Sequence, residues 1–330
     1  MPITRRTLIG GAAALTLASA ARAQNTPGPS PYKSGASGPV WPAREQFKLW
    51  PGLPPGSPVS LPKPDNTMNG PADRRELWLR GVAEPVVAVY RPKKPDGRAV
   101  LSIPGGGYQF VSIENEGMDV ARTLTPHGIT VFVLAYRLPG EGWAMRADVP
   151  LQDAQRAMRL IRARAATWGI DAAKLGLVGF SAGGHLGAML AVGHADKVYA
   201  PIDAADALSA RPTYAGLVYP AVSFNSAGFE ERKENGLWGD STDPATAARY
   251  NALDRVTSET PPIFLVHAMN DGTVPIQQSL AMIDACRRAK VPVEAHLLES
   301  GGHGFGAMHL PLVAPGRLWP EVFARWTAKH

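Results

Sequence analysis

Apolar runs of five or six residues recur along the chain from residue 86 onward, and stretches with helical periodicity separate them. Short apolar runs bounded by turn residues predict buried strands, here at 86–90, 99–103, 130–135, 175–180, 215–219, 263–267 and 293–298. Strands that alternate with helices predict an α/β fold, with a mostly parallel sheet covered by helices on both faces.

The clearest helix lies between the third and fourth of these strands. One face of it carries apolar residues at spacings of three and four, namely Leu151, Ala154, Met158, Ile161, Ala165 and Trp168. Its arginines, Arg156, Arg159 and Arg162, are expected to form a solvated face.

The first 64 residues follow a different pattern. Residues 1–23 contain Arg5-Arg6, then a Gly/Ala/Leu stretch and an Ala-Arg-Ala cleavage site, which is typical of a twin-arginine signal peptide. The apolar run 8–21 is short and rich in alanine, so export to the periplasm or the medium is favoured over a membrane anchor. Residues 24–64 are rich in proline and glycine and predict an extended leader. Its Trp41 and Trp50 are expected to pack against a catalytic domain of residues 65–330.

Composition and charge limit the possible partners. With 330 residues and 45% hydrophobic content, the chain can bury a large core, as one α/β domain after a tail or as two small domains. Removal of residues 1–23 takes away three arginines and lowers the formal charge from +6 to +3. Because no basic block remains, no nucleic-acid or membrane-surface partner is expected. Cys286 is the sole cysteine, so it cannot form an intrachain disulfide, and its helical context predicts burial.

Gly-Phe-Ser-Ala-Gly at 179–183 joins the strand 175–180 to a helix of small residues. G-x-S-x-G between a strand and a helix holds the serine hydroxyl on a tight, exposed turn, and glycines are needed because the turn leaves no room for side chains. Ser181 is therefore the candidate nucleophile. The alternative is a helix-capping serine in a glycine-rich turn.

A serine nucleophile needs a histidine base and a carboxylate that orients it, in the chain order Ser, Asp, His in this kind of fold. Asp271 follows the strand 263–267, at an edge where ligand-binding residues gather, although a turn aspartate ahead of Gly272 is the alternative. His303 lies in a glycine-rich loop after the strand 293–298 and is the candidate base. His309, in the same loop, is the second candidate.

The strand 99–103 runs into Pro-Gly-Gly-Gly-Tyr at 104–108. Backbone N–H groups of Gly106 and Gly107, together with that of Ala182, are expected to form an oxyanion hole, with Pro104 where the HGGG type has histidine. A phosphate-binding loop is disfavoured, because no Lys-Ser/Thr follows and the G-x-G-x-x-G spacing is absent. Paired histidine or cysteine ligands are also absent from the sequence, so neither a metal nor another cofactor is expected.

Seven segments from Leu49 to the end of the chain carry a family resemblance. They are LWPGLPPGSP, PGGGYQFVSIENEG, VFVLAYRLPG, PLQDAQRAMRLIRARAATWGID, LGLVGFSAGGHLGAML, FLVHAMNDGTVPIQQSL and ESGGHGFG. They resemble exported bacterial α/β-hydrolases grouped with acetylxylan esterases and acetyl/feruloyl carbohydrate esterases, relatives of which are often labelled endo-1,4-β-xylanases. The resemblance implies an α/β-hydrolase fold without a large cap domain. Asn270 departs from it, since relatives commonly carry a second aspartate there.

The resemblance and the residues together predict a serine esterase for short-chain acyl groups, acetyl or feruloyl, on a small-molecule or carbohydrate ester. A glycosidase would need two carboxylates facing one glycosidic bond, and no such pair stands in a recognisable context. Two alternatives remain open: a serine peptidase or amidase of prolyl-oligopeptidase-like type, and a non-catalytic ligand-binding relative. Residues 221–261 are short and polar, which predicts an open, polar-rimmed site.

Overall fold

The structure is a computed structural model that describes residues 40–330, except 71, 73, 227, 229–235 and 240–242, together with the strand Ser30–Pro31. The predicted signal peptide, residues 1–23, lies outside the described residues, as does almost all of the leader before residue 40. The same holds for residues 230–234 and 240, which are charged residues in the first half of the polar segment 221–261.

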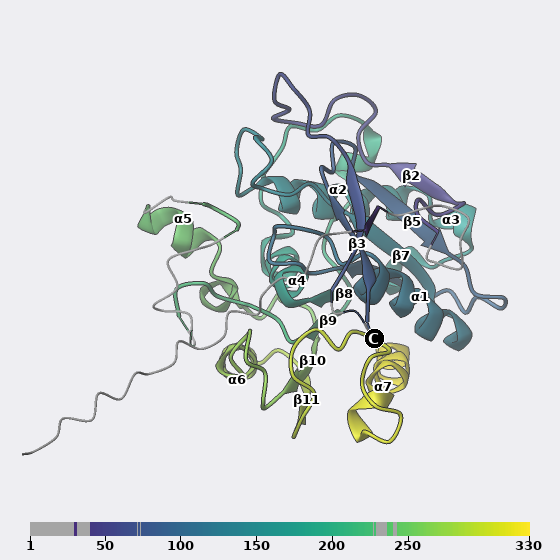
Figure 1. Cartoon of the computed structure of the whole chain (residues 1–330), viewed down its shortest axis with the longest axis vertical. Coiled ribbons are helices and arrows are strands. Elements are labelled where there is room, and N and C mark those ends of the chain that lie inside the picture. Colours follow the sequence, from purple (N-terminus) through teal and green to yellow (C-terminus); the bar gives the residue numbers. More distant parts are fainter. Residues whose placement is uncertain are drawn as a thin grey trace, which may run out of the picture.

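A mostly parallel sheet of eight strands forms the centre of the fold, in the order β11-β10-β9-β8-β6-β7-β5-β2 (Figure 1). Six neighbouring strands, β7, β6, β8, β9, β10 and β11, run parallel to one another. Strand β5 is antiparallel to β7, and β2 is antiparallel to β5. The strands of this sheet are β2 Gln46–Lys48, β5 Val86–Tyr90, β6 Ala99–Ile103, β7 Thr130–Ala135, β8 Leu175–Phe180, β9 Ala215–Val218, β10 Ile263–Ala268 and β11 Val293–Leu298. All seven strands predicted from the apolar runs are present, with ends that agree to within one residue.

Helices cover both faces of the sheet (Figure 1). On one face α1 contacts α7, and on the other α2 contacts α4, while α6 packs against β10 and β11. The α-helices are α1 Asp119–Leu124, α2 Val149–Ala163, α3 Ala165–Trp168, α4 Ser181–Gly193, α5 Pro244–Arg249, α6 Gln277–Arg288 and α7 Trp319–Trp326. The shorter helical turns are η1 Glu114–Met118, η2 Thr125–His127, η3 Ala172–Lys174, η4 Ala204–Ala207, η5 Ala252–Arg255, η6 Pro315–Leu318 and η7 Thr327–Lys329.

The chain reverses its direction of travel across the sheet between β6 and β8. The β6 crossover leads to β7 on one side, and the β8 crossover leads to β9 on the other. Right-handed crossovers then place α1 and α4 on opposite faces. The connections that leave the carboxyl ends of β6 and β8 therefore diverge, which leaves a crevice there of the kind that binds ligands in open α/β sheets.

Residues 40–50 pack onto this domain. Trp41, Leu49 and Trp50 are buried, and β2 pairs with the outer edge of β5. The Trp50 indole donates a hydrogen bond to Asp153 Oδ1 (2.8 Å), and Asp153 forms a fully buried ion pair with Arg137.

A second, three-stranded sheet stands beside the main one, in the order β1-β3-β4. Its strands are β1 Ser30–Pro31, β3 Asp65–Asn69 and β4 Glu76–Arg80. The sequence analysis did not predict it, although β4 alternates: Leu77 and Leu79 are buried and the residues between them are half-buried. Leu79 also exchanges two backbone hydrogen bonds with Val111, so β4 borders the glycine loop after β6.

The predicted solvated arginine face of α2 is wrong for Arg156. This side chain is buried, and its guanidinium binds Asp203, Asp206 and the Leu49 carbonyl. The reason is that the segment after α4 folds over the helix and supplies acceptors. The single helix expected through residue 168 is also divided, because Arg164 leaves the helical conformation between α2 and α3.

Candidate active site

Ser181 is the first residue of α4 and follows directly on β8. Its φ of +52° lies in the left-handed region, which is strained for a residue with a side chain. The residues on either side of the turn must be glycines because a side chain at either position would clash with the backbone. A β-carbon on Gly179 would lie 2.4 Å from the Gly183 carbonyl oxygen, and one on Gly183 would lie 2.2 Å from that of Ile103. The G-x-S-x-G spacing therefore permits a turn that presents the Ser181 hydroxyl at the crevice.

The structure brings Ser181, His303 and Asp271 together. His303 Nε2 lies 2.9 Å from Ser181 Oγ, and His303 Nδ1 lies 2.7 Å from Asp271 Oδ2. In this arrangement one ring nitrogen can accept the serine proton, while the carboxylate fixes the tautomer and stabilises the imidazolium. The assignment of catalytic roles to the three residues remains a prediction.

The Asp271 side chain is fully buried and makes several hydrogen bonds. Its Oδ1 accepts hydrogen bonds from the backbone N–H groups of Thr273 and Val274, and its Oδ2 lies 3.3 Å from His267 Nε2. Burial alone would raise the pKa of Asp271, but the hydrogen bonds from His267 and His303 outweigh it and hold the pKa well below its usual range. The group is therefore ionised across the neutral range.

The other histidines lie in different surroundings. His309 faces Asp119, with Nε2 3.8 Å from Oδ2. His185 lies behind the turn, where its ring nitrogens bind the Tyr108 hydroxyl and the Tyr250 carbonyl, and burial lowers its pKa to about 4. Of the two candidate bases, His303 is the one within hydrogen-bond distance of Ser181 Oγ.

Gly106, Gly107 and Ala182 line the same pocket as Ser181. Gly106 and Gly107 have φ values of +127° and +62°, and a β-carbon on Gly106 would lie 2.1 Å from the Phe110 carbonyl oxygen. Ala182 is in the first turn of α4, where backbone N–H groups have no partner within the helix. Their use as oxyanion donors stays a prediction.

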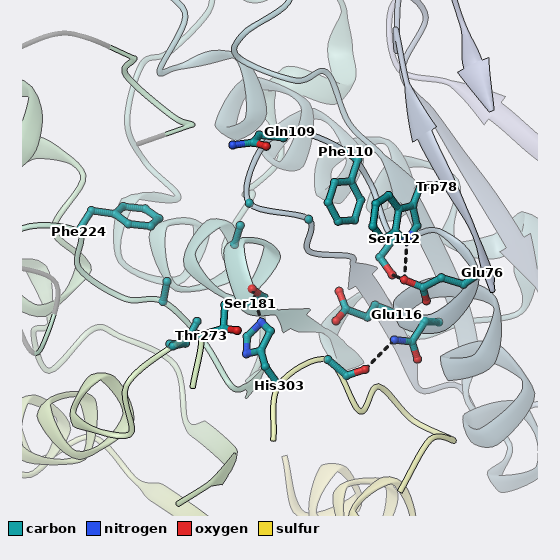
Figure 2. A pocket seen from close by; sticks show the side chains of 17 residues that line it. Glu76, Trp78, Gln109, Phe110, Ser112, Glu116, Ser181, Phe224, Thr273 and His303 are labelled. Atoms are coloured by element: carbon teal, nitrogen blue, oxygen red, sulfur yellow. Dashed lines mark hydrogen bonds between the residues drawn. The ribbon is translucent and has the colours of Figure 1, made fainter. Parts of the chain in front are cut away.

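A pocket of about 370 Å³ surrounds these groups (Figure 2). In Figure 2, Phe224 and Thr273 lie on one side of Ser181, and Trp78, Phe110 and Glu76 lie on the other. The Trp78 and Phe110 rings stack with centroids 3.7 Å apart. The acyl and alcohol parts of an ester could thus occupy opposite sides of the hydroxyl.

Glu76 is a carboxyl group in the wall of this pocket. Its Oε1 accepts hydrogen bonds from Trp78 Nε1 (2.5 Å) and Ser112 Oγ (3.0 Å). Burial raises the pKa of Glu76 from 4.5 to about 8, against the hydrogen bond from Trp78. The group is therefore largely protonated at neutral pH.

Comparison with known proteins gives the family. A family model described as BD-FAE matches residues 87–285, more than half of the chain, including the glycine loop, Ser181 and Asp271. The chain belongs to the BD-FAE family.

Similar proteins carry esterase and xylanase names. This BD-FAE chain is 30% identical over 221 residues to an acetylxylan esterase of Xylanibacter ruminicola, covering 66% of the chain and 43% of that protein. It is 32% identical over 206 residues to endo-1,4-beta-xylanase B of Butyrivibrio fibrisolvens, covering 62% of the chain and 32% of that protein. The chain thus spans less than half the length of these curated relatives.

A solved structure matches nearly end to end. An acetyl ester-xyloside bifunctional hydrolase from Caldicellulosiruptor lactoaceticus superimposes with a TM-score of 0.69 and 28% identity, covering 87% of this chain and 97% of that one. Together with the sheet order, this confirms the predicted α/β-hydrolase fold and the family resemblance. The esterases among the relatives support the predicted class, a carboxylic-ester hydrolase.

Two further findings concern the described part of the chain. No helix in it is both long enough and apolar enough to cross a membrane. Nor do three or more His, Cys, Asp or Glu side chains gather there in a group that could hold a metal ion.

Sequence reasoning missed Glu76, Trp78, Glu116 and Tyr219, all of which lie in or beside the pocket. Glu116 and Trp78 line it, and the Tyr219 ring lies against His303, with centroids 4.7 Å apart. The segment that holds Glu116, SIENEG, was noticed as part of the family resemblance, but without a role for the glutamate. The alternation of Glu76–Arg80 was the available signal for Trp78.

Proposed function

We propose that this BD-FAE protein is a serine esterase that hydrolyses short-chain acyl esters, acetyl or feruloyl, on a carbohydrate. The observation that carries the proposal is the pair of hydrogen bonds joining Ser181, His303 and Asp271 at the mouth of the crevice. The esterase names of its relatives support the same chemistry.

The proposed reaction has two halves. Ser181 Oγ attacks the acyl carbonyl while His303 Nε2 takes its proton, and N–H groups of Gly106, Gly107 and Ala182 stabilise the oxyanion. His303 then gives the proton to the departing alcohol, which leaves an acyl ester on Ser181. Water, deprotonated by His303, attacks this ester and releases the acid and free Ser181. Asp271 stays ionised throughout and orients the imidazole.

Features of the pocket wall support a sugar as the alcohol. The stacked Trp78 and Phe110 rings offer an apolar surface of the kind that packs against sugar C–H groups, and the adjacent Glu76 and Ser112 offer hydrogen-bonding groups for hydroxyls. An acetyl group would fill only a small part of about 370 Å³, which leaves room for such an alcohol.

Ser181→Ala tests the proposal directly. We expect a folded protein that loses esterase activity by at least about 10³-fold and loses covalent labelling by a fluorophosphonate, because the nucleophile is gone. Ser60→Ala, in an exposed loop, is the matched control and should keep both. Wild-type turnover in Ser181→Ala would refute the proposed mechanism.

A substrate panel separates the esterase from the alternatives. Acetylated xylan, methyl ferulate, nitrophenyl acetate and a nitroanilide should be compared on the purified protein. Hydrolysis of the anilide at a higher kcat/KM than the matched ester would favour the peptidase or amidase reading. No turnover of any member, with intact phosphonate labelling, would contradict the substrate class but not the nucleophile.

Export by the twin-arginine route, to the periplasm or the medium, is also proposed on the sequence of residues 1–23. Expression of the full chain followed by N-terminal sequencing of the exported protein tests it. We expect a mature chain that starts at Gln24, and we expect Arg5→Lys/Arg6→Lys to abolish its export.

A further inference from the structure

Glu116 is a buried carboxylate beneath the glycine loop of the proposed oxyanion hole. It belongs to η1, a π-helical turn, a kind of turn that occurs frequently at functional sites. Its side chain is buried, and Oε2 accepts a hydrogen bond from the Gly105 N–H at 2.6 Å. A β-carbon on Gly105 would lie 2.9 Å from that oxygen, so the loop rests directly on the carboxylate.

The second oxygen of Glu116 is connected by hydrogen bonds to the loop that carries His303, the proposed base. Oε1 accepts a hydrogen bond from the Tyr219 hydroxyl (2.7 Å), and that hydroxyl accepts one from the Gly306 N–H (2.9 Å). The Tyr219 ring also lies against the His303 ring. One carboxylate thus connects the residue before Gly106 with the segment after His303.

Neighbouring contacts hold the same loop at other points. The Asn115 side-chain amide donates to the Gly304 carbonyl (3.0 Å), and Asn270 Oδ1 accepts from the N–H groups of Gly301 and Gly302. His303 therefore sits in a loop of glycines whose conformation is fixed from outside. Without those contacts, glycines would leave the imidazole many orientations.

Both oxygens of Glu116 act as acceptors in this arrangement, one from the Gly105 N–H and one from the Tyr219 hydroxyl. A glutamine would replace one of these acceptors with an amide N–H group, so the contact to Tyr219 would have to reverse its direction or break.

The surroundings of Glu116 act on its ionisation in two opposite ways. Burial raises the pKa of Glu116, while the hydrogen bonds from Tyr219 and Gly105 and the charge of His303 oppose the rise. The two contacts of the carboxyl group therefore favour its ionised form.

We propose that Glu116 is a positioning residue that holds the oxyanion loop and the base loop in register, through Gly105 on one side and Tyr219 on the other. The inference rests on the proposed serine esterase. In this role Glu116 does not contact the reacting atoms.

Glu116→Gln tests the proposal, with Tyr219→Phe as its partner. We expect Glu116→Gln to lower kcat for nitrophenyl acetate by about 10- to 100-fold with little change in KM, because the donors and the base are displaced from each other. Tyr219→Phe, which removes the hydroxyl that Glu116 binds, should likewise lower kcat with little change in KM.

Glu114→Gln is the matched control. Glu114 stands in the same π-helical turn, but its carboxylate accepts from the Leu77 N–H and it does not line the pocket. It should keep kcat within about twofold. Glu116→Asp should also lose kcat, because the shorter side chain cannot reach both Gly105 and Tyr219.

Two outcomes would overturn the inference: wild-type kcat in Glu116→Gln, or an equal loss in Glu114→Gln. If Glu116→Gln fails to fold, Tyr219→Phe decides, and its unchanged kcat would overturn the role. Ser181→Ala, run in parallel, separates the two proposals. An active Ser181→Ala refutes the esterase mechanism, whereas an active Glu116→Gln beside an inactive Ser181→Ala refutes only the positioning role.

Discussion

His303 and His309 belong to one loop but face different carboxylates. His303 bridges Asp271 and Ser181, whereas His309 stands near Asp119, where burial lowers its pKa. Replacement of His303 by Ala is expected to lower kcat by several orders of magnitude, because Ser181 then has no proton acceptor. His309→Ala should change kcat less than about tenfold. Steady-state kinetics on nitrophenyl acetate measure both, and equal small losses would mean that another group is the base.

The functional residues differ in whether their roles could be predicted from the sequence. Ser181, Asp271 and His303 were predictable because their order and their strand-end positions follow from the fold. Asn270 appeared as a departure, but its side-chain oxygen holds the Gly301 and Gly302 N–H groups, which an aspartate oxygen could also do. Glu116 was not predictable, because a π-helical turn directs it inward and no period in the sequence signals such a turn.

Among the elements, the strands with apolar runs were predictable, and the edge strand β2 was not. Strands β6, β7, β8 and β10 are buried at every position, so their apolar runs are continuous. The three residues of β2 carry no such run and form a strand because the edge of β5 supplies partners. Arg156 was misassigned for a related reason: its partners, Asp203 and Asp206, come from a distant segment that covers α2.

The ion pair between Arg137 and Asp153 connects α2 with segments of the chain that lie outside the helices and strands. Both side chains are fully buried, Asp153 also binds Trp50, and the Arg137 guanidinium lies over the Trp143 ring. Asp153→Ala should lower the free energy of unfolding by about 3 to 5 kcal/mol, because it leaves an uncompensated buried cation. Urea denaturation measures the change.

The exposed pair Lys48–Glu84 serves as the control for that prediction. Glu84→Ala should cost less than about 1 kcal/mol, since solvent screens an exposed ion pair. A similarly small loss in Asp153→Ala would contradict the assigned role of the buried pair.

At the scale of the whole molecule, the raised pKa of Glu76 links folding to pH. The folded protein holds this proton up to about pH 8, whereas the unfolded chain releases it near 4.5. Stability from this group is therefore highest below pH 4.5 and falls as the pH rises to about 8, by up to about 5 kcal/mol. Glu76→Gln, which mimics the protonated form, should match the wild-type Tm at pH 5 and exceed it at pH 9. Equal Tm values at pH 9 would contradict the shift.

The size of the pocket bears on the acyl group. An acyl methylene contributes about 0.8 kcal/mol only where an apolar surface buries it, and a pocket of about 370 Å³ must also hold the alcohol. Acetyl and propionyl nitrophenyl esters should therefore exceed the octanoyl ester in kcat/KM. A preference for octanoyl would instead indicate an apolar groove that continues past Phe224 and Trp238, whose rings pack against each other.

The short strand β2 also affects the tendency of the protein to self-associate, because it covers the edge of β5. It occupies backbone donors and acceptors on the outer side of β5, and Glu45 extends the cover by accepting from the Val89 N–H. Without residues 40–50, β5 would be an open edge of apolar sequence, VVAVY, ready to pair with the same edge of a second molecule. Residues 40–50 thus cover this edge of β5, and their removal is expected to favour edge-to-edge aggregation.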